Sequence, residues 1–139
     1  MSTGAWVAVA AVVVALAFGL WRRRVDGRFS EVQDDAGTTS VLAGTPFDDS
    51  LGERATLLQF SSAFCAPCRT TRVVLADVAG RHDGVAHVEV DAEQHLDLVR
   101  TLGVMRTPTT IVLDPAGREL GRAAGAPTRA QVESVLPVA

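Results

Sequence analysis

The sequence contains no lysine and no tyrosine, and only two of its 139 residues are cysteine. The missing lysine excludes Schiff-base enzymes and phosphate-binding loops that need a lysine. Two cysteines are too few for a disulfide-stapled scaffold or for an all-cysteine zinc site within one chain. All 13 basic residues are arginine, and from residue 29 onward nine of them stand against 15 acidic residues. This acidic balance makes nucleic acid a poor candidate partner.

The first 21 residues contain no charged side chain, whereas the rest of the chain has the composition of an ordinary soluble domain. Residues 5–21 are mostly apolar, and as a helix they would extend about 26 Å, near the lower limit for crossing a bilayer. Trp6 and Trp21 stand near the two ends, where interfacial aromatic residues are common. We therefore expect residues 1–21 to be a single-pass anchor in the cell membrane.

A cleaved signal peptide and a buried core helix are the alternatives to an anchor. A signal peptide has basic residues before its apolar stretch and a small-residue cleavage site after it. Residues 1–4 carry no basic side chain, and Arg22, Arg23 and Arg24 follow the stretch. Arginine-rich flanks favour the cytoplasmic side, so they predict a cytoplasmic domain, although arginine also reaches headgroups on either face. Residues 22–39 lack periodicity and predict a basic flank with a flexible linker.

Residues 40–139 alternate between segments typical of strands and of helices. The chain order is a short strand at 41–42, a strand at 56–61, a helix at 68–81, a strand at 85–90, a helix at 94–102, strands at 109–113 and 119–124, and a helix capped by Thr128 that extends to residue 136. Strands joined by helices are expected to be parallel, and the final hairpin antiparallel. The pattern predicts an α/β domain with a mixed central sheet flanked by helices.

Both cysteines lie in the run 64–69, Phe-Cys-Ala-Pro-Cys-Arg, directly between a predicted strand and a predicted helix. A helix N-terminus stabilises the thiolate, which is the reactive form of cysteine, so Cys65 is expected there and partly exposed. Cys68 lies about one turn further on, within reach of a mixed disulfide on Cys65. Pro67 suits a first helical turn, and Arg69 adds positive charge. The spacing supplies the attacking and resolving thiols that thiol–disulfide exchange requires.

Two other interpretations of the cysteine pair stay open at this point. The pair is half of a zinc site if a dimer, His87 or His95 completes it, and it is structural if both thiols are inert in the core. The three histidines, including His82, are isolated in the sequence and are expected at the surface. We expect no metal.

The chain resembles the thioredoxin family over residues 56–136, with a weaker part at 39–55. Members of that family carry a Trp-Cys-x-x-Cys motif after a strand; here Phe64 takes the tryptophan position. The resemblance implies that Cys65 is the nucleophile and Cys68 the resolving cysteine. It also implies that Ala66 and Pro67 tune the pair, and that the domain has the thioredoxin-like fold.

A second part of the resemblance lies about 40 residues further on, where residues 103–109 read Gly-Val-Met-Arg-Thr-Pro-Thr. The family has a cis-proline opposite its cysteines, and Pro108 matches it. The residue before that proline offers its backbone to an extended substrate, which implies this role for Thr107. Met105 and Arg106 are then expected to border the substrate groove.

The chain departs from the family at the buried aspartate that is thought to assist proton transfer at the resolving cysteine. Gln59 stands at that position and cannot titrate, so proton transfer must use water or another group. Glu89 is a candidate for that group. Some membrane-tethered thioredoxin-like reductases also lack the aspartate.

Together these features predict a membrane-tethered thiol–disulfide oxidoreductase that reduces protein disulfides and uses no cofactor beyond its own cysteine pair. Its expected partners are protein disulfides and an upstream thiol reductant or membrane electron donor. If the domain faces outward, disulfide oxidation, isomerisation or cysteine maturation is the alternative activity. A binding module that keeps the fold and ignores the thiols is the non-catalytic alternative.

Overall fold

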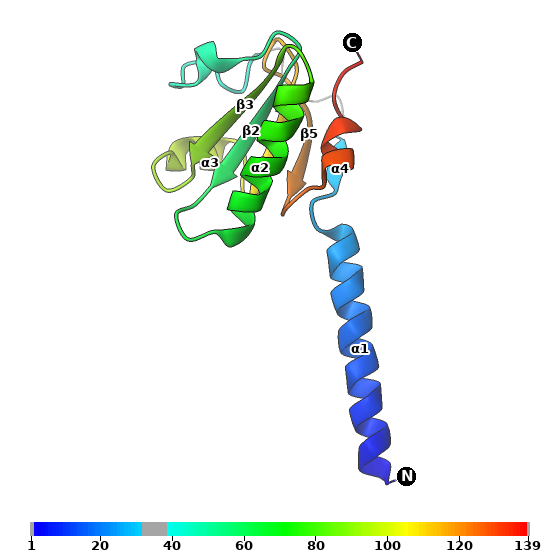
Figure 1. Ribbon diagram of the computed structural model, residues 1–139. Helices are drawn as coiled ribbons and strands as arrows, with labels where there is room; N and C mark the ends of the chain where they lie inside the picture. Colours follow the sequence, from blue (N-terminus) through cyan, green and yellow to red (C-terminus); the bar gives the residue numbers. More distant parts are fainter. Residues whose placement is uncertain (1, 32–38, 139) are drawn as a thin grey trace.

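The computed structural model describes residues 2–31 and 39–138, and it shows an α/β domain at the end of one long helix (Figure 1). The elements are α1 (Thr3–Val25), β1 (Phe29–Glu31), the 3-10 helix η1 (Asp48–Ser50), β2 (Ala55–Ser61), α2 (Ala66–Arg81), β3 (Val85–Asp91), α3 (Leu96–Thr101), β4 (Thr109–Leu113), β5 (Glu119–Ala124) and α4 (Arg129–Glu133). The five strands form a single mixed sheet in the order β1-β5-β4-β2-β3. The predicted fold class is therefore confirmed.

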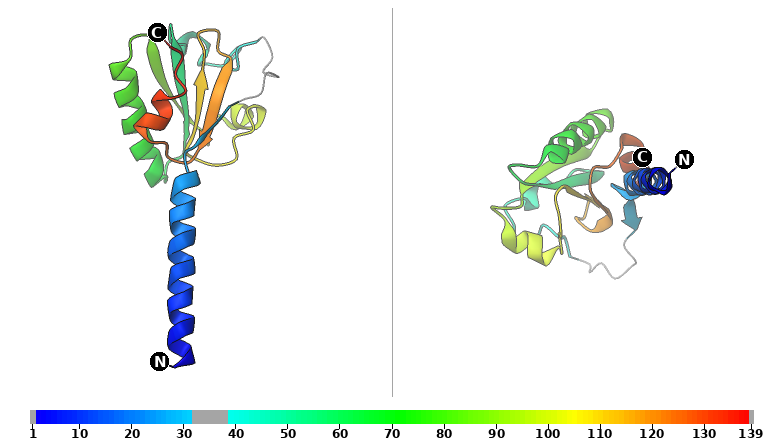
Figure 2. Two further views of the ribbon diagram at one scale, coloured as in Figure 1. Left: turned by 90° about the vertical axis from the view of Figure 1, so that its right-hand side faces the viewer. Right: turned by 90° about the horizontal axis from the view of Figure 1, so that it is seen from below.

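Helices cover both faces of the sheet, and each face has its own apolar core (Figure 2). Successive side chains of a strand point to opposite faces, and β2 is buried along its whole length. Leu57 packs with Leu75 of α2 and Val132 of α4. Leu58 packs on the other face with Leu98 of α3. The central strand thus anchors both layers, which holds its carboxyl end in a fixed position.

The length of each connecting helix decides whether the next strand is parallel or antiparallel. The 16 residues of α2 extend about 24 Å, close to the roughly 23 Å of the seven-residue β2, so the chain returns to the start of the sheet and β3 runs parallel to β2. The six residues of α3 extend only about 9 Å. This short helix does not return the chain along β3, and β4 begins at the end of the sheet where β3 ends. Our expectation that β4 would be parallel is wrong: β4 is antiparallel to β2.

Helix α1 is longer than the predicted span and contains no buried residue. Its 23 residues are long and apolar enough to cross a membrane, as are those of a signal sequence. It runs through the three arginines of the predicted basic flank and ends at Val25.

The predicted linker at 22–39 is not uniformly extended. After α1 ends, Phe29 to Glu31 form β1, which pairs antiparallel with β5 in the register Phe29↔Ala123. Nothing in the sequence indicated this strand, because three residues show no periodicity. The strand forms by pairing with β5, which lies far away along the chain. Residues 32–38 of the predicted linker lie outside the described residues.

The strand predicted at 41–42 is a turn instead. Local hydrogen bonds close it: Ala43 N–H donates to Ser40 O, and Thr45 N–H donates to Leu42 O. Two apolar residues before Gly-Thr-Pro are too few to pair with a sheet, but Leu42 is fully buried in the core beside α3. The predicted helix at 94–102 is confirmed as the shorter α3, and the one after Thr128 as the shorter α4, with its capping box present.

Replacing Leu42 with alanine tests whether this turn supports the core. We expect Leu42→Ala to lower the free energy of unfolding by about 2–5 kcal/mol, because a buried leucine leaves a cavity when truncated. Leu96→Ala is the matched control, since Leu96 is 50% exposed. Urea unfolding of the full chain in detergent micelles, followed by circular dichroism, measures both. Equal losses in the two variants would contradict the assignment of Leu42 to the core.

Candidate active site

The two cysteines lie where β2 ends and α2 begins, and they are joined by a disulfide with Cα atoms 5.2 Å apart. Cys65 is the N-cap of α2, and its Sγ accepts a hydrogen bond from Cys68 N–H at 3.2 Å. Cys65 is partly exposed, whereas Cys68 is only 2% exposed. The helix begins at Ala66, with Pro67 in its first turn. One sulfur is therefore accessible to another protein, and the other is protected behind it.

The loop that precedes β4 lies against the end of β2. The Thr107–Pro108 peptide bond is cis, as the resemblance implies, and Pro108 is buried. The hydroxyls of Ser62 and Thr107 are 3.1 Å apart and share a hydrogen bond. Ser62 and Thr107 are 45 residues apart in the sequence, so this contact places the second predicted motif next to the cysteine motif.

A buried amide lies directly beneath the resolving cysteine. Gln59 is fully buried, and its Nε2 donates to Cys68 O at 2.9 Å and to Ser61 Oγ at 3.0 Å. Its Oε1 lies 3.0 Å from His87 Nε2. Ser61 in turn donates to Glu89 Oε1 at 2.7 Å. The amide satisfies its hydrogen bonds without a charge, so a network replaces the single acid that the resemblance implies at this position.

The titratable groups of this network are His87 and Glu89. Burial lowers the pKa of His87, which favours the neutral ring beside Gln59. The guanidinium of Arg72 donates twice to the Glu89 carboxylate, at 2.6 and 2.7 Å, and lowers its pKa, with a further contribution from Ser61. A carboxylate held ionised in this way is a weak base. Glu89 is therefore part of the network, as an ion-paired anion.

The remaining predicted residues separate into two groups. Phe64 is fully exposed beside Cys65, and Ala66, Pro67 and Arg69 are exposed on the first turn of α2. Arg106, in contrast, is bound to the junction with α1: it donates to Asp26 Oδ1 at 2.9 Å and to Ala124 O at 2.7 Å. Arg106 also lines a groove together with Met105, and its role toward a substrate stays a prediction.

The sequence analysis missed Ser61, Ser62 and Asp26. The two serines directly precede the cysteine motif, and that position was the only available signal. Asp26 gave none, because its partner Arg106 is 80 residues away. No group of three potential metal ligands occurs within residues 2–31 and 39–138.

Comparisons with known proteins agree with this geometry. A sequence model described as thioredoxin matches residues 38–137. The chain is 36% identical over 72 residues to thioredoxin domain-containing protein 2 of Homo sapiens, which covers 50% of this chain and 13% of that protein. It is 37% identical over 70 residues to thioredoxin H2-1 of Oryza sativa subsp. japonica, covering 50% of each chain. The chain thus matches half or less of the length of these two relatives.

Solved structures also share the fold. A mutant thioredoxin from Halobacterium salinarum NRC-1 superimposes with a TM-score of 0.59 at 20% identity. The superposition covers 67% of this chain and 85% of that one.

The lowered pKa of His87 predicts how stability depends on pH. The unfolded chain takes up the proton at the ordinary histidine pKa of 6.5, above the folded-state value, so it binds more protons in the interval between them. The contribution of neutral His87 to the free energy of unfolding should be complete at pH values above 6.5. It should decrease as the pH falls towards the folded-state pKa. His87→Asn should flatten this decrease, whereas His82→Asn, at the far end of α2, should keep it. Urea titrations from pH 7.5 to pH 5 measure both; an unchanged slope in His87→Asn would contradict the assignment.

Proposed function

Because the chain belongs to the thioredoxin family, we propose that it is a membrane-tethered thiol–disulfide oxidoreductase that reduces disulfides in other proteins. The observation that carries the proposal is the asymmetry of the cysteine pair. Cys65, partly exposed at a helix N-terminus, is the nucleophile, and buried Cys68 is the resolving thiol. Phe64, Thr107 and Pro108 border the position where a substrate would lie.

The reaction begins with the reduced pair. The Cys65 thiolate attacks one sulfur of a substrate disulfide, forming a mixed disulfide and releasing the first substrate thiolate. Cys68 loses its proton and attacks Cys65 Sγ, which forms the intramolecular disulfide and releases the second substrate thiol. Two electrons and two protons pass to the substrate, and an upstream dithiol restores the pair. The helix N-terminus favours the Cys65 thiolate, since its free N–H groups and dipole stabilise negative charge.

Deprotonation of Cys68 must proceed without an acid at position 59. Gln59 holds the backbone of Cys68 but cannot accept its proton. A cavity of about 290 Å³ lies beside the network, lined in part by Ser61, Arg72 and Glu89. We propose that water in this cavity carries the proton to solvent.

We further propose that α1 anchors the protein and that the domain faces the cytoplasm. The helix is long and apolar, and Arg22, Arg23 and Arg24 follow at its end, on the side of the domain. The cytoplasm keeps thiols reduced, which makes reduction of substrates the favoured direction.

Single serine substitutions separate the roles of the two cysteines. Cys65→Ser should reduce a model disulfide at the uncatalysed rate, with dithiothreitol as donor, because the remaining thiol, Cys68, is buried. Cys68→Ser should instead accumulate mixed disulfides that survive non-reducing electrophoresis. Val73→Ser, on the exposed side of α2, is the control and should keep the wild-type rate. A wild-type protein without activity would leave only the non-catalytic binding module.

A membrane-impermeant thiol label tests the side of the membrane. After treatment of intact cells with an impermeant reductant, the label should miss the cysteines, because both lie in the domain. After permeabilisation it should react with them. Labelling of intact cells would overturn the cytoplasmic placement, and disulfide oxidation or isomerisation would then be the favoured activity.

A further inference from the structure

The register of the strands places the redox site at the same end of the sheet as the junction with α1. Phe29, the first residue of β1, pairs with Ala123 near the end of β5. Ala124 of β5 pairs with Thr109, the first residue of β4. Thr109 also pairs with Phe60, close to the end of β2. The start of β1 and the end of β2 therefore lie at the same end of the sheet, and Cys65 follows β2 there.

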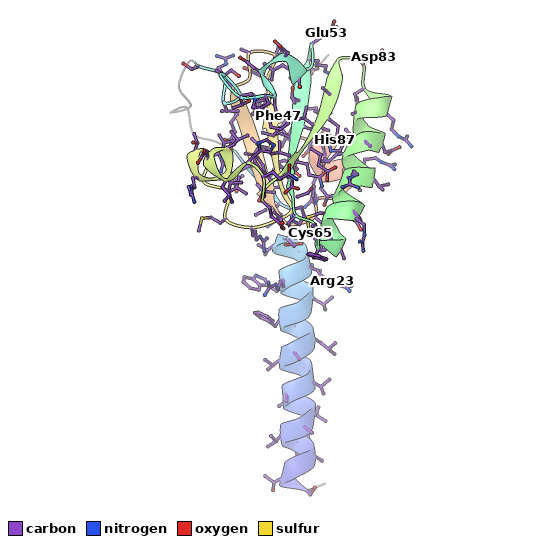
Figure 3. The ribbon with its side chains drawn as sticks, turned by 90° about the vertical axis from the view of Figure 1, so that its left-hand side faces the viewer. Arg23, Phe47, Glu53, Cys65, Asp83 and His87 are labelled. Atoms are coloured by element: carbon purple, nitrogen blue, oxygen red, sulfur yellow. A yellow bond between two sulfur atoms is a disulfide. The ribbon has the colours of Figure 1, made fainter. Side chains whose placement is uncertain are left out.

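The views of the molecule agree with this register. The loop between β2 and α2 is the part of the domain that lies nearest to the level of the α1 C-terminus (Figure 1). Cys65 lies at the base of the domain, at the level of the upper end of α1 (Figure 3). Seen from below, α1 leaves the domain at one side and leaves most of its base uncovered (Figure 2). A membrane crossed by α1 would thus lie opposite the cysteine motif.

The connection between α1 and the sheet is short and held by hydrogen bonds. Only three residues separate Val25 at the end of α1 from Phe29 at the start of β1. Within them, Gly27 N–H donates to Ala124 O at 3.1 Å, and Asp26 Oδ2 accepts from Ala126 N–H at 3.4 Å. Gly27 is buried with φ +71°, and a Cβ there would overlap the carbonyl group of Ala126, so no larger residue fits. The residues that follow α1 are therefore held against the domain.

The same contacts hold the loop that carries the cis-proline. Arg106, two residues before Pro108, forms an ion pair with Asp26 at 2.9 Å and donates to Ala124 O. Gly125 N–H donates to Pro108 O at 2.8 Å. The proposed substrate-binding loop is thus attached directly to the end of α1.

Side chains near this end of the sheet suit a membrane interface. Phe64 is 100% exposed and Met105 92% exposed, and both are apolar. The three arginines at the end of α1 match anionic headgroups. A groove of about 440 Å³ between α1 and the loop is lined by Val25, Met105 and Arg106, among others. An apolar side chain at such a position contacts lipid or a segment emerging from it.

We propose that the redox pair faces the membrane surface and that its substrate is a disulfide in the juxtamembrane segment of an integral membrane protein. This inference rests on the proposed reductase function and on α1 as an anchor. The exchange is the one given above: two electrons and two protons pass from the reduced pair to that disulfide. A disulfide in a soluble protein, or one far from the bilayer, would have to reach the narrow space under the domain.

Reconstitution of the full chain tests the proposal. The vesicles contain phosphatidylcholine and phosphatidylglycerol, and the probes are single-span peptides with a Cys-x-x-Cys disulfide. In the proximal peptide the disulfide directly follows the span; in the distal one a Gly/Ser spacer of about 20 residues, about 25 Å in root-mean-square length, precedes it. With dithiothreitol as donor, we expect the proximal peptide to be reduced roughly tenfold faster, as its effective concentration at Cys65 is higher.

A Gly/Ser insertion of about 20 residues between Val25 and Asp26 is the matched variant, because it frees the domain and leaves the Asp26–Arg106 contact intact. It should bring the proximal and distal rates within about twofold of each other. The variant should reduce a soluble disulfide peptide at least as fast as wild type does, which shows that the variant is folded. Equal proximal and distal rates with wild type, or an unchanged preference after insertion, would overturn the membrane-facing site. Failure of wild type to reduce even the soluble peptide would instead overturn the proposed function.

Discussion

The carbonyl oxygen of Ala124 accepts hydrogen bonds from both Gly27 N–H and the guanidinium of Arg106. This single acceptor joins the end of α1, the end of β5 and the loop before Pro108. The other links between α1 and the domain are the Asp26–Arg106 ion pair, the hydrogen bond from Ala126 N–H to Asp26, and the β1 pairing, which comprises three residues. An edge strand of this length has little stability of its own. The end of α1 and the cis-proline loop thus share contacts, since Arg106 binds both Ala124 O and Asp26.

The polar network under Cys68 meets a second constraint, that a buried polar group needs a hydrogen-bond partner. An aspartate at position 59 would be a buried acid that needs compensation. Gln59 avoids the charge and still binds Cys68 O, while the charge of the network lies nearer the surface, in the Arg72–Glu89 pair. Gln59 therefore holds the Cys68 backbone without a buried charge of its own, and under the proposed mechanism proton transfer falls to water.

Local signals in the sequence were sufficient for the site and for most of the fold. The Cys-Ala-Pro-Cys run lies at its predicted strand-to-helix junction, and Pro108 is cis. The antiparallel direction of β4 was not predicted, because the sequence indicated a longer helix, at 94–102, than the six-residue α3. Strand β1 and the Asp26–Arg106 pair could not be predicted from the sequence. Each depends on a partner about 80 or more residues away, which no local pattern identifies. Leu42 is intermediate: its apolar character was read correctly, but as a strand residue.

The charge distribution gives the short junction a further consequence. From residue 29 onward the chain is acidic, and an anionic membrane surface repels an acidic domain over about one Debye length, near 8 Å at physiological ionic strength. On a long flexible linker such a domain would spend most of its time away from the bilayer. If α1 is the anchor proposed above, the three hydrogen-bonded residues after it would prevent this, because they hold β1 close to the end of the helix. The arginines that precede the junction compensate part of the repulsion where the domain approaches the surface. In a membrane-anchored protein the junction, rather than the net charge, would therefore determine the distance of Cys65 from the bilayer.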